Sequence, residues 1–274
     1  MTQLIHKDIS YIVRGVMFDV YNKLGPKLKE EIYQSAFTHG LRERGITCEP
    51  EKKFEMIYRN QSAGQYYVDH WLENGKVILE LKVAPNIMPI HQAQTISYLK
   101  VTDADLAILI NFGTNNIQSE RFPNFMRDST LEAKRANFQW NPPPLNKNLL
   151  YAELTNTILE ALHRVHFTLG PAFIHRIYRK AVMIEFKYQN LGYEYIKKIQ
   201  LYYNNHHVGE QEVQMIKVEN QVLLSVFASQ AINKVMVRVM KSRMKQLGMK
   251  VGLLANFHGE KLVVERVSLS TTFL

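Results

Sequence analysis

The strongest constraint on the fold is a repeat, because the two halves of this 274-residue chain match at a constant offset of 145 residues. The match runs without a gap from Gly25 to Asn111 of the first copy. Its anchors are pairs of dipeptides: Gly25-Pro26 with Gly170-Pro171, Ile32-Tyr33 with Ile177-Tyr178, Glu73-Asn74 with Glu219-Asn220 (displaced by one residue), and Asn111-Phe112 with Asn256-Phe257. Self-similarity at a fixed offset marks duplicated units, so we expect two tandem domains of one fold.

A segment of different composition separates the copies. Residues 127–150 are polar and then proline-rich, with three consecutive prolines at 142–144. Consecutive prolines favour an extended, fairly stiff polyproline segment. We therefore expect a first domain over residues 1–126, a linker over 127–150 and a second domain over 151–274.

The pattern of apolar residues predicts the class of the fold. In the first copy, apolar residues follow helical spacing from Ile5 to Leu24 and again from Ile32 to Leu41. Runs rich in β-branched and aromatic residues indicate strands, and a further helix precedes a last apolar strand. These segments are the strands 46–58, 66–72 and 77–83, the helix 89–100 and the strand 106–112. The order α-α-β-β-β-α-β predicts an α/β domain whose mixed sheet is flanked by helices.

Composition narrows the class of protein. Hydrophobic residues make up 46% of the chain, which is enough for two ordinary cores. The single cysteine, Cys48, can build neither a disulfide framework nor a cysteine zinc site within the chain, which suits a reducing compartment. No apolar run approaches the length of a membrane span, and the start, MTQLIHKDIS, lacks a signal-peptide pattern. We expect a globular cytoplasmic protein.

One strand-like stretch, YYVDHWLENGKVILELK at residues 66–82, is apolar but contains charged residues. Burying a charge costs several kcal/mol unless it is paired or binds a metal. Asn74-Gly75 is a strong hairpin signal, because both turn positions need a positive φ. With these two residues as the turn, Glu73 faces Lys76, and the register of the whole hairpin follows.

This register brings two carboxylates together, because Asp69 then lies directly opposite Glu80. Lys82 points to the same face by strand alternation, whereas the opposite face, towards the core, carries Val77, Leu79 and Leu81. Directly opposed side chains have Cβ atoms roughly 4.5–5.5 Å apart, a separation at which two carboxylates repel unless a cation lies between them. Carboxylates suit Mg²⁺ or Mn²⁺, and a lysine can hold a phosphate or orient water. The pattern indicates phosphodiester hydrolysis, with a partly exposed ion-pair cluster as the alternative.

These residues resemble a known signature. Asp69, followed after a tight turn by Glu80-Leu81-Lys82, is similar to the motif of the PD-(D/E)xK nuclease superfamily, and Gln94 to Tyr98 resembles the QxxxY helix motif of its exonuclease-like branch. The resemblance covers roughly residues 5–125. It implies two tandem restriction-endonuclease-like domains and a metal-dependent nuclease.

A third motif resembles one family of that superfamily. Glu30-Glu-Ile-Tyr33, following Gly25-Pro26, is similar to the motif of the GxxExxY family. Lys27 stands where the family pattern has a glycine. Since a glycine there would serve the conformation of the loop, this difference bears on the family name more than on the site.

The resemblance also implies roles. Asp69 and Glu80 would bind the metal, with the Leu81 carbonyl as a possible further ligand, and Lys82 would assist the attacking water. Glu30 would be a further acidic residue of the site. Gln94 and Tyr98, which lie one helical turn apart, would position the lysine or a phosphate.

The second copy lacks every one of these side chains. At the constant offset, Glu30 corresponds to His175, Asp69 to Gln214, Glu80 to Ser225, Lys82 to Phe227, Gln94 to Val239 and Tyr98 to Arg243. No divalent cation would bind to such a set. The second domain is therefore expected to be a catalytically inactive copy.

The second copy is basic instead. Residues 1–125 carry 14 Lys+Arg and 14 Asp+Glu, whereas residues 126–274 carry 20 and 11, which is the whole net charge of +9. Four basic residues follow helical spacing, with Arg243 nearby: Lys234, Arg238, Lys241 and Lys245. No acidic residue lies between Glu219 and Glu260. This stripe predicts a surface for nucleic-acid phosphates, with an ordinary solvated helix face as the alternative.

Three functions fit these observations. The leading hypothesis is a nuclease dependent on Mg²⁺ or Mn²⁺ and acting on nucleic acid, with DNA favoured over RNA. In it the first domain cleaves, and the second aids binding or packs as a pseudo-dimer partner; a homodimer is the other assembly considered, and no membrane partner is expected. The second hypothesis is a nucleic-acid-binding or scaffolding protein that keeps the fold without cleaving. The third is a protein-interaction module.

Overall fold

The computed structural model describes residues 5–124 and 135–269. The chain divides into two compact units, residues 1–57 with 64–130 and residues 58–63 with 131–274. The expected boundary at residue 126 and the first part of the expected linker lie outside the described residues. Residues 141–150 are exposed and lie in no helix or strand, the three consecutive prolines included.

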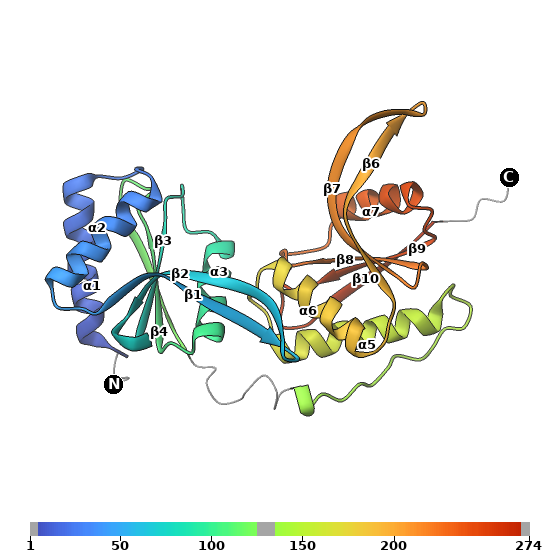
Figure 1. The fold of residues 1–274 in the computed structure, drawn as a ribbon, viewed down its shortest axis with the longest axis horizontal. Coiled ribbons are helices and arrows are strands. Elements are labelled where there is room, and N and C mark those ends of the chain that lie inside the picture. The colour runs from blue at the N-terminus through green and yellow to red at the C-terminus, as the bar shows by residue number, and fades with distance from the viewer. Residues whose placement is uncertain (1–4, 125–134, 270–274) are drawn as a thin grey trace. The chain divides into compact units, whose positions relative to one another are not determined.

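The first repeat is a five-stranded mixed sheet flanked by helices. Its elements are α1 (Lys7–Leu24), α2 (Glu30–Glu43), β1 (Cys48–Tyr58), β2 (Gln61–Leu72), a short 3₁₀ turn η1 (Glu73–Gly75), β3 (Val77–Lys82), α3 (Pro89–Thr102), β4 (Leu106–Asn111) and β5 (Gln118–Pro123). The strand order is β1-β2-β3-β4-β5, and β3 and β4 run parallel. The helices α1 and α2 cover one face of the sheet and α3 the other (Figure 1).

The predicted class and order of elements are confirmed, but β5 was not predicted. Its sequence, QSERFP, is polar and only partly buried because it forms one edge of the sheet. By contrast β4 is buried at every position, as its continuous apolar sequence predicts for a strand covered on both faces.

The hairpin has the predicted register. His70 pairs with Leu79 and Leu72 with Val77, as predicted, and Asp69 and Glu80 come directly after the last pair. The inward residues join the core beneath α1 and α2: Val77, Leu79 and Leu81. The turn has positive φ at Glu73 as well as at Asn74 and Gly75. A Cβ on Gly75 would lie 2.3 Å from the Trp71 ring, so the glycine is needed for space as well as for conformation.

The second repeat has the same architecture. Its elements are α5 (Ala152–Leu169), α6 (His175–Tyr188), β6 (Tyr193–Tyr203), β7 (His206–Val218), β8 (Val222–Phe227), α7 (Lys234–Gln246), β9 (Val251–Asn256) and β10 (Val263–Ser268). The sheet has the order β10-β9-β8-β7-β6 with β8 and β9 parallel, and β6 and β7 form a long hairpin (Figure 1). None of the described helices combines the length and the apolar character that crossing a bilayer requires.

The sequence anchors of the repeat are structural. In the first repeat, the Tyr33 hydroxyl donates to the Gly25 carbonyl at 2.6 Å, and its ring stacks on Phe112 at 4.2 Å. In the second, Tyr178 donates to Gly170 at 2.6 Å and stacks on Phe257 at 4.6 Å. One tyrosine thus fixes the loop between the first two helices in each copy, which explains why these dipeptides recur.

The gapless offset is wrong at one place. Leu72 pairs with Val77, but Val218 pairs with Val222, so the second hairpin turn is one residue shorter. The residue that the turn lacks is inserted in β7 instead. Two residues of β7, Val213 and Gln214, lie between two successive ladder pairs, whereas β6 has a single residue between the same pairs. This β-bulge has Gln214 at a φ of 50°. Because it adds the residue that the turn lacks, the offset is 145 both before the bulge and after the turn.

Lys27 has the left-handed backbone conformation that glycine favours. Its φ is 68°, and its counterpart in the second repeat, Ala172, has a φ of 79°. The Lys27 N–H donates to the Phe112 carbonyl at 3.0 Å, which holds the loop in place. Both repeats therefore keep a backbone that costs about 1–2 kcal/mol for any residue with a Cβ.

We expect Lys27→Gly to raise the free energy of unfolding by about 0.5–1 kcal/mol, because the relieved strain exceeds the entropy that a glycine adds to the unfolded chain. The measurement is urea unfolding of the full chain. The matched control is Lys76→Gly, at an exposed lysine with a φ of −61°, which should lower the free energy of unfolding. Equal effects of the two changes would contradict the argument.

Candidate active site

Asp69 lies where β2 and β3 separate. The last ladder pair on this side is His70 with Leu79. Beyond it, the Asp69 carboxylate takes the place of a backbone acceptor, and its Oδ2 accepts the N–H of Leu81 at 2.6 Å. Its Oδ1 accepts from the Gln34 amide of α2 at 2.8 Å. The aspartate is thus held by one backbone and one side-chain donor at the opening between two strands.

Glu80 and Lys82 lie beside it on β3. Glu80 is 2% exposed, and its Oε1 accepts from the Lys82 ammonium at 2.6 Å. Its Oε2 is buried and has no hydrogen-bond partner among the described residues. A buried carboxylate oxygen without a partner is costly, so the site retains an unused acceptor.

Burial raises the pKa of both carboxyl groups. The pKa of Glu80 rises to about 8, because of burial first and of Asp69 second. The pKa of Asp69 rises to about 6, again because of burial, which outweighs the Leu81 N–H. Burial would lower the pKa of Lys82, but the Glu80 carboxylate outweighs it and the pKa is raised. The site therefore disfavours two bare carboxylates at neutral pH.

Glu30, the first residue of α2, reaches the same place. Its Oε1 lies 3.9 Å from the Lys82 ammonium, and its side chain is 36% exposed. Gln94 and Tyr98 of α3 hydrogen-bond to each other at 2.5 Å. Burial and then the Glu80 charge raise the pKa of Tyr98, which places its ring near the carboxylates. All six predicted side chains thus belong to one region of the first repeat, although their roles stay predictions.

Sequence reasoning missed two residues of this region. Gln34 donates to Asp69 and lies one helical turn after Glu30. The pKa of His91 is lowered by burial and then by the charge of Lys82, and His91 lies one turn before Gln94 on α3. Helical spacing of three or four residues from a predicted site residue was the available signal in both cases.

The residues fit a divalent cation. Two buried carboxylates with raised pKa values, one of them with an oxygen that has no partner among the described residues, form a set of hard oxygen ligands. Within the described ranges no group of three or more His, Cys, Asp or Glu side chains is arranged around a common metal position. Further ligands would have to come from backbone oxygens, such as the Leu81 carbonyl, from water and from substrate phosphate, as is common for Mg²⁺.

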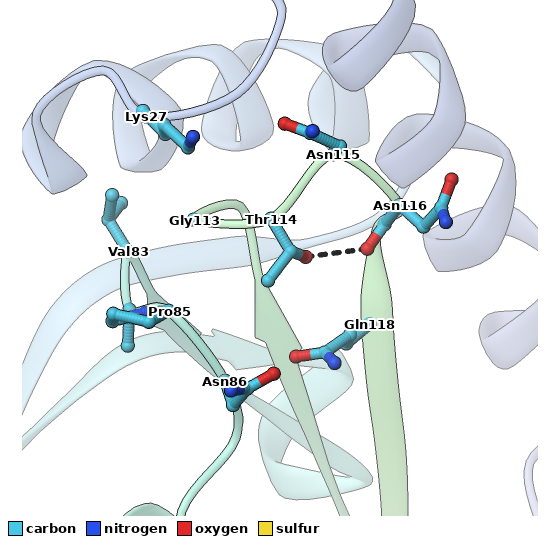
Figure 2. A pocket seen from close by; sticks show the side chains of 10 residues that line it. Lys27, Val83, Pro85, Asn86, Gly113, Thr114, Asn115, Asn116 and Gln118 are labelled. Atoms are coloured by element: carbon cyan, nitrogen blue, oxygen red, sulfur yellow. Dashed lines mark hydrogen bonds between the residues drawn. The ribbon is translucent and has the colours of Figure 1, made fainter.

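The first repeat has a cavity of about 580 Å³, and part of its lining directly follows the site residues of β3 in the sequence (Figure 2). It lies at the carboxyl ends of the parallel strands β3 and β4, and Val83, one of its lining residues, comes directly after Lys82. Lys27 also lines it, as do five polar residues of the loops and of the start of β5: Asn86, Thr114, Asn115, Asn116 and Gln118. The carboxyl ends of parallel strands are a common place for ligands.

In the second repeat the corresponding positions are neutral or basic. His175 begins α6 as Glu30 begins α2, and Phe227 is packed against an apolar core cluster. Ser225 replaces the carboxylate on β8, and Gln214 accepts a hydrogen bond from Arg179 instead of from a glutamine. Of the two α7 positions, Val239 is 44% exposed and Arg243 donates to Gln246 at 2.9 Å.

The predicted basic stripe lies on α7. Its residues are exposed, and none of the four has an ion pair with another described residue: Lys234, Arg238, Lys241 and Lys245. The apolar face of α7 is held by Met240 and Met244, which are fully buried. The helix thus presents four positive charges that form no ion pair within the described ranges.

Comparisons with known proteins agree with the architecture. A family model described as the PD-(D/E)XK nuclease superfamily matches residues 7–122 and, a second time, residues 152–267. A solved structure described as "Crystal structure of SSO0001" is similar over 44% of this chain and 79% of its own, with 11% identity and a TM-score of 0.29, a likeness too weak to carry an argument. No curated protein matches the chain.

The raised pKa values predict how stability depends on pH in the absence of metal. A carboxyl group whose pKa is raised on folding stabilises the fold below its unfolded pKa, and this contribution is lost as pH rises through the folded pKa. For Glu80 the window runs from 4.5 to about 8. In EDTA, the free energy of unfolding of the first repeat should fall across this window, by up to a few kcal/mol.

Glu80→Gln should remove most of this slope, as measured by urea unfolding at a series of pH values. Glu55→Gln, at an exposed carboxylate of β1, is the control and should leave the slope unchanged. A wild-type stability that rises steadily from pH 5 to 8 would contradict the assigned burial of Glu80.

Proposed function

Since the chain belongs to the PD-(D/E)XK nuclease superfamily, we propose that its first repeat hydrolyses phosphodiester bonds of nucleic acid, with DNA favoured over RNA. The observation that carries this proposal is the buried pair of Asp69 and Glu80 beside Lys82, at the point where β2 and β3 separate. The tyrosine-anchored Gly25-Pro26 loop before Glu30 supports placing the chain in the GxxExxY family.

Asp69 and Glu80 would hold the cation, Mg²⁺ or Mn²⁺. The Leu81 N–H and the Gln34 amide fix the Asp69 carboxylate, so its orientation is set before any ligand arrives. The unpartnered Glu80 Oε2 supplies a further acceptor. When bound, the cation would stabilise negative charge on the phosphate and lower the pKa of an attacking water.

Lys82 would act on the water and the phosphate. Its ammonium donates to Glu80 in the absence of ligand, and it would turn to the phosphate once a cation neutralises that carboxylate. Glu30, 3.9 Å from the ammonium, would keep the lysine charged and oriented. Gln94 and Tyr98 would support the far side of the site from α3. The neighbouring cavity offers room for the nucleotide next to the scissile phosphate.

The second repeat would bind without cleaving. Ser225 and Phe227 stand where the carboxylate and the lysine stand in the first repeat, so the chemistry has no counterpart there. The exposed stripe on α7 would contact phosphates of the backbone, with Arg243 beside it. Packing of the two repeats as a pseudo-dimer, or of two chains as a homodimer, is a further possible use of the inactive copy.

We expect Asp69→Asn and Glu80→Gln to abolish cleavage, because each removes a ligand of the cation. Lys82→Ala should retain cation binding but lower turnover roughly 10²–10⁴-fold, the usual range for a group that assists proton transfer. The measurement is degradation of labelled single-stranded and duplex DNA and RNA with Mg²⁺, Mn²⁺ or EDTA, and calorimetry with Mn²⁺ follows the cation.

Lys76→Ala is the matched control, since this exposed lysine precedes the same strand and should leave turnover within about twofold of wild type. Cleavage that persists in the Lys82 and Glu80 variants would refute the assigned site. Wild-type protein that binds nucleic acid but cleaves none of these substrates would favour the alternative function, a nucleic-acid-binding or scaffolding protein with the nuclease fold.

The stripe on α7 has a separate test. Changing Lys234, Arg238, Lys241 and Lys245 together to Ala should weaken binding across unrelated sequences and reduce the slope of log affinity against log salt by up to about four, at nearly 0.9 per duplex contact. Turnover at saturating substrate should survive, because contacts far from the reacting group bind ground state and transition state alike.

A variant with four exposed lysines of the first repeat changed to Ala controls for net charge: Lys7, Lys23, Lys53 and Lys76. If both quadruple variants bind nucleic acid equally well, the stripe is an ordinary solvated face.

A further inference from the structure

A buried arginine without a carboxylate partner occupies the second repeat. Arg179 lies on α6 and is 7% exposed. Its guanidinium donates to the Tyr195 hydroxyl at 3.2 Å and to the side-chain oxygen of Gln214. Its Nε is buried and has no hydrogen-bond partner in the described part of the chain, and no Asp or Glu of those residues forms an ion pair with it. A full positive charge is thus held by neutral groups alone.

Such an arrangement is costly in the protein by itself. Burying a charge without a counter-charge costs several kcal/mol even when some hydrogen bonds are made. Elsewhere in this repeat a buried charge is compensated, because the buried carboxylate of Glu185 lies 3.4 Å from the Arg164 guanidinium. Arg179 therefore lacks the opposite charge that Glu185 has on the same helix. An anion bound beside Arg179 would supply that charge.

The position of Arg179 is that of a site residue. Arg179 corresponds to Gln34 at the constant offset. The ladder gives Met215 the strand position of Asp69, because Ile216 pairs with Leu224 as His70 pairs with Leu79. The hydrogen bond of Asp69 with Gln34 is replaced by that of the adjacent bulge residue Gln214 with Arg179. The bulge in β7 gives Gln214 its φ of 50° and directs its side chain to the arginine. The first repeat thus has two carboxylates and a glutamine here, and the second has a buried guanidinium with neutral groups around it.

A second arginine and a neutral imidazole lie at the same end of α6. His175 and Arg176, in the first turn of this 14-residue helix, are exposed. The pKa of His175 is lowered by burial and then by Arg179 and Arg176, so the three side chains are near one another. The first-turn N–H groups of a helix also favour an anion. The buried arginine thus lies one helical turn from the exposed start of α6.

We propose that Arg179 binds a backbone phosphate of nucleic acid at the position that corresponds to the cation site of the first repeat. A guanidinium matches the geometry of phosphate with parallel donors and stays charged when buried. The identity of the ligand rests on the proposed function, in which nucleic acid is the substrate. The inactive copy thereby keeps the phosphate-binding part of the ancestral site and loses the hydrolytic part.

The experiment measures binding of fluorescein-labelled single-stranded and duplex oligonucleotides to the full chain in EDTA, where the first repeat cannot cleave. Arg179→Gln, which restores the residue of the first repeat, should lower affinity about tenfold or more and reduce the salt slope by about one. Lys180→Gln, the same charge change at the next, exposed position of α6, should lower affinity less than twofold. Affinity equal in the two variants would overturn the proposal.

The melting temperature separates this role from a structural one. Because Arg179→Gln removes an uncompensated buried charge, the ligand-free variant should melt at the same temperature as wild type or higher. If it fails to fold, hydrogen exchange on wild-type protein decides the matter. Oligonucleotide should then protect the segments 172–180 and 212–216, and absence of protection would overturn the proposal.

Inorganic phosphate distinguishes the source of the anion. If millimolar phosphate protects the 172–180 segment in wild type but not in Arg179→Gln, while oligonucleotide affinity is equal in both, the site takes free phosphate and the proposal for nucleic acid is wrong. The cleavage assay is independent of this result. Protein that never cleaves but loses binding on Arg179→Gln would refute only the nuclease assignment, and protein that cleaves but binds normally in this variant would refute only the present inference.

Discussion

The hydrogen bond from the Leu81 N–H to the Asp69 carboxylate is the constraint on which the site depends. A ladder between β2 and β3 would otherwise continue, and Glu80 would be one more strand residue. By accepting this N–H itself, Asp69 ends the ladder and remains beside Glu80 at 2% exposure. The energetic consequence is a pair of carboxyl groups with raised pKa values, which a cation would relieve.

The duplication separates interactions that hold the fold from interactions that serve chemistry. The tyrosine that donates to the glycine carbonyl and stacks on a phenylalanine is present in both repeats with nearly the same distances. So is the left-handed backbone at Lys27 and Ala172, even though neither residue is glycine. The polar groups of the site differ completely between the repeats. Two copies of one fold in one chain thus provide a comparison in which packing is constant and charge varies.

Sequence predicted those parts of the fold that follow from local rules. Asn74-Gly75 needs positive φ values, and this requirement together with strand alternation gave the register and the inward face of β3. The polar edge strand β5 was missed, because an edge strand has neither the apolar run nor the strict alternation of a buried one. The bulge at Gln214 was also missed, since a one-residue insertion that a shorter turn cancels leaves the offset of the flanking sequence unchanged.

The partners of the site residues were harder to predict than the residues themselves. Gln34 and His91 matter through tertiary contacts with Asp69 and Lys82, and amide and imidazole side chains on a helix have no distinctive spacing of their own. The same holds for Arg179, whose significance lies in burial without a counter-charge. Burial of a charge is a property of the fold and has no sequence pattern of its own. Here only the comparison with Gln34 of the first repeat indicates that position 179 belongs to the site.

The two repeats need opposite charges at this place, and a phosphodiester together with a divalent cation would supply both. Asp69 and Glu80 need positive charge, which a divalent cation supplies while leaving coordination positions for phosphate oxygens. Arg179 needs negative charge, which a phosphate supplies directly. Loss of the cation site would ordinarily remove affinity for the substrate, because the cation is the group that attracts phosphate. Placing a guanidinium at the Gln34 position replaces that attraction with a permanent charge that needs no metal and cannot activate water. In the proposed assignment, one guanidinium would thus bind phosphate in the second repeat without the groups that hydrolysis needs.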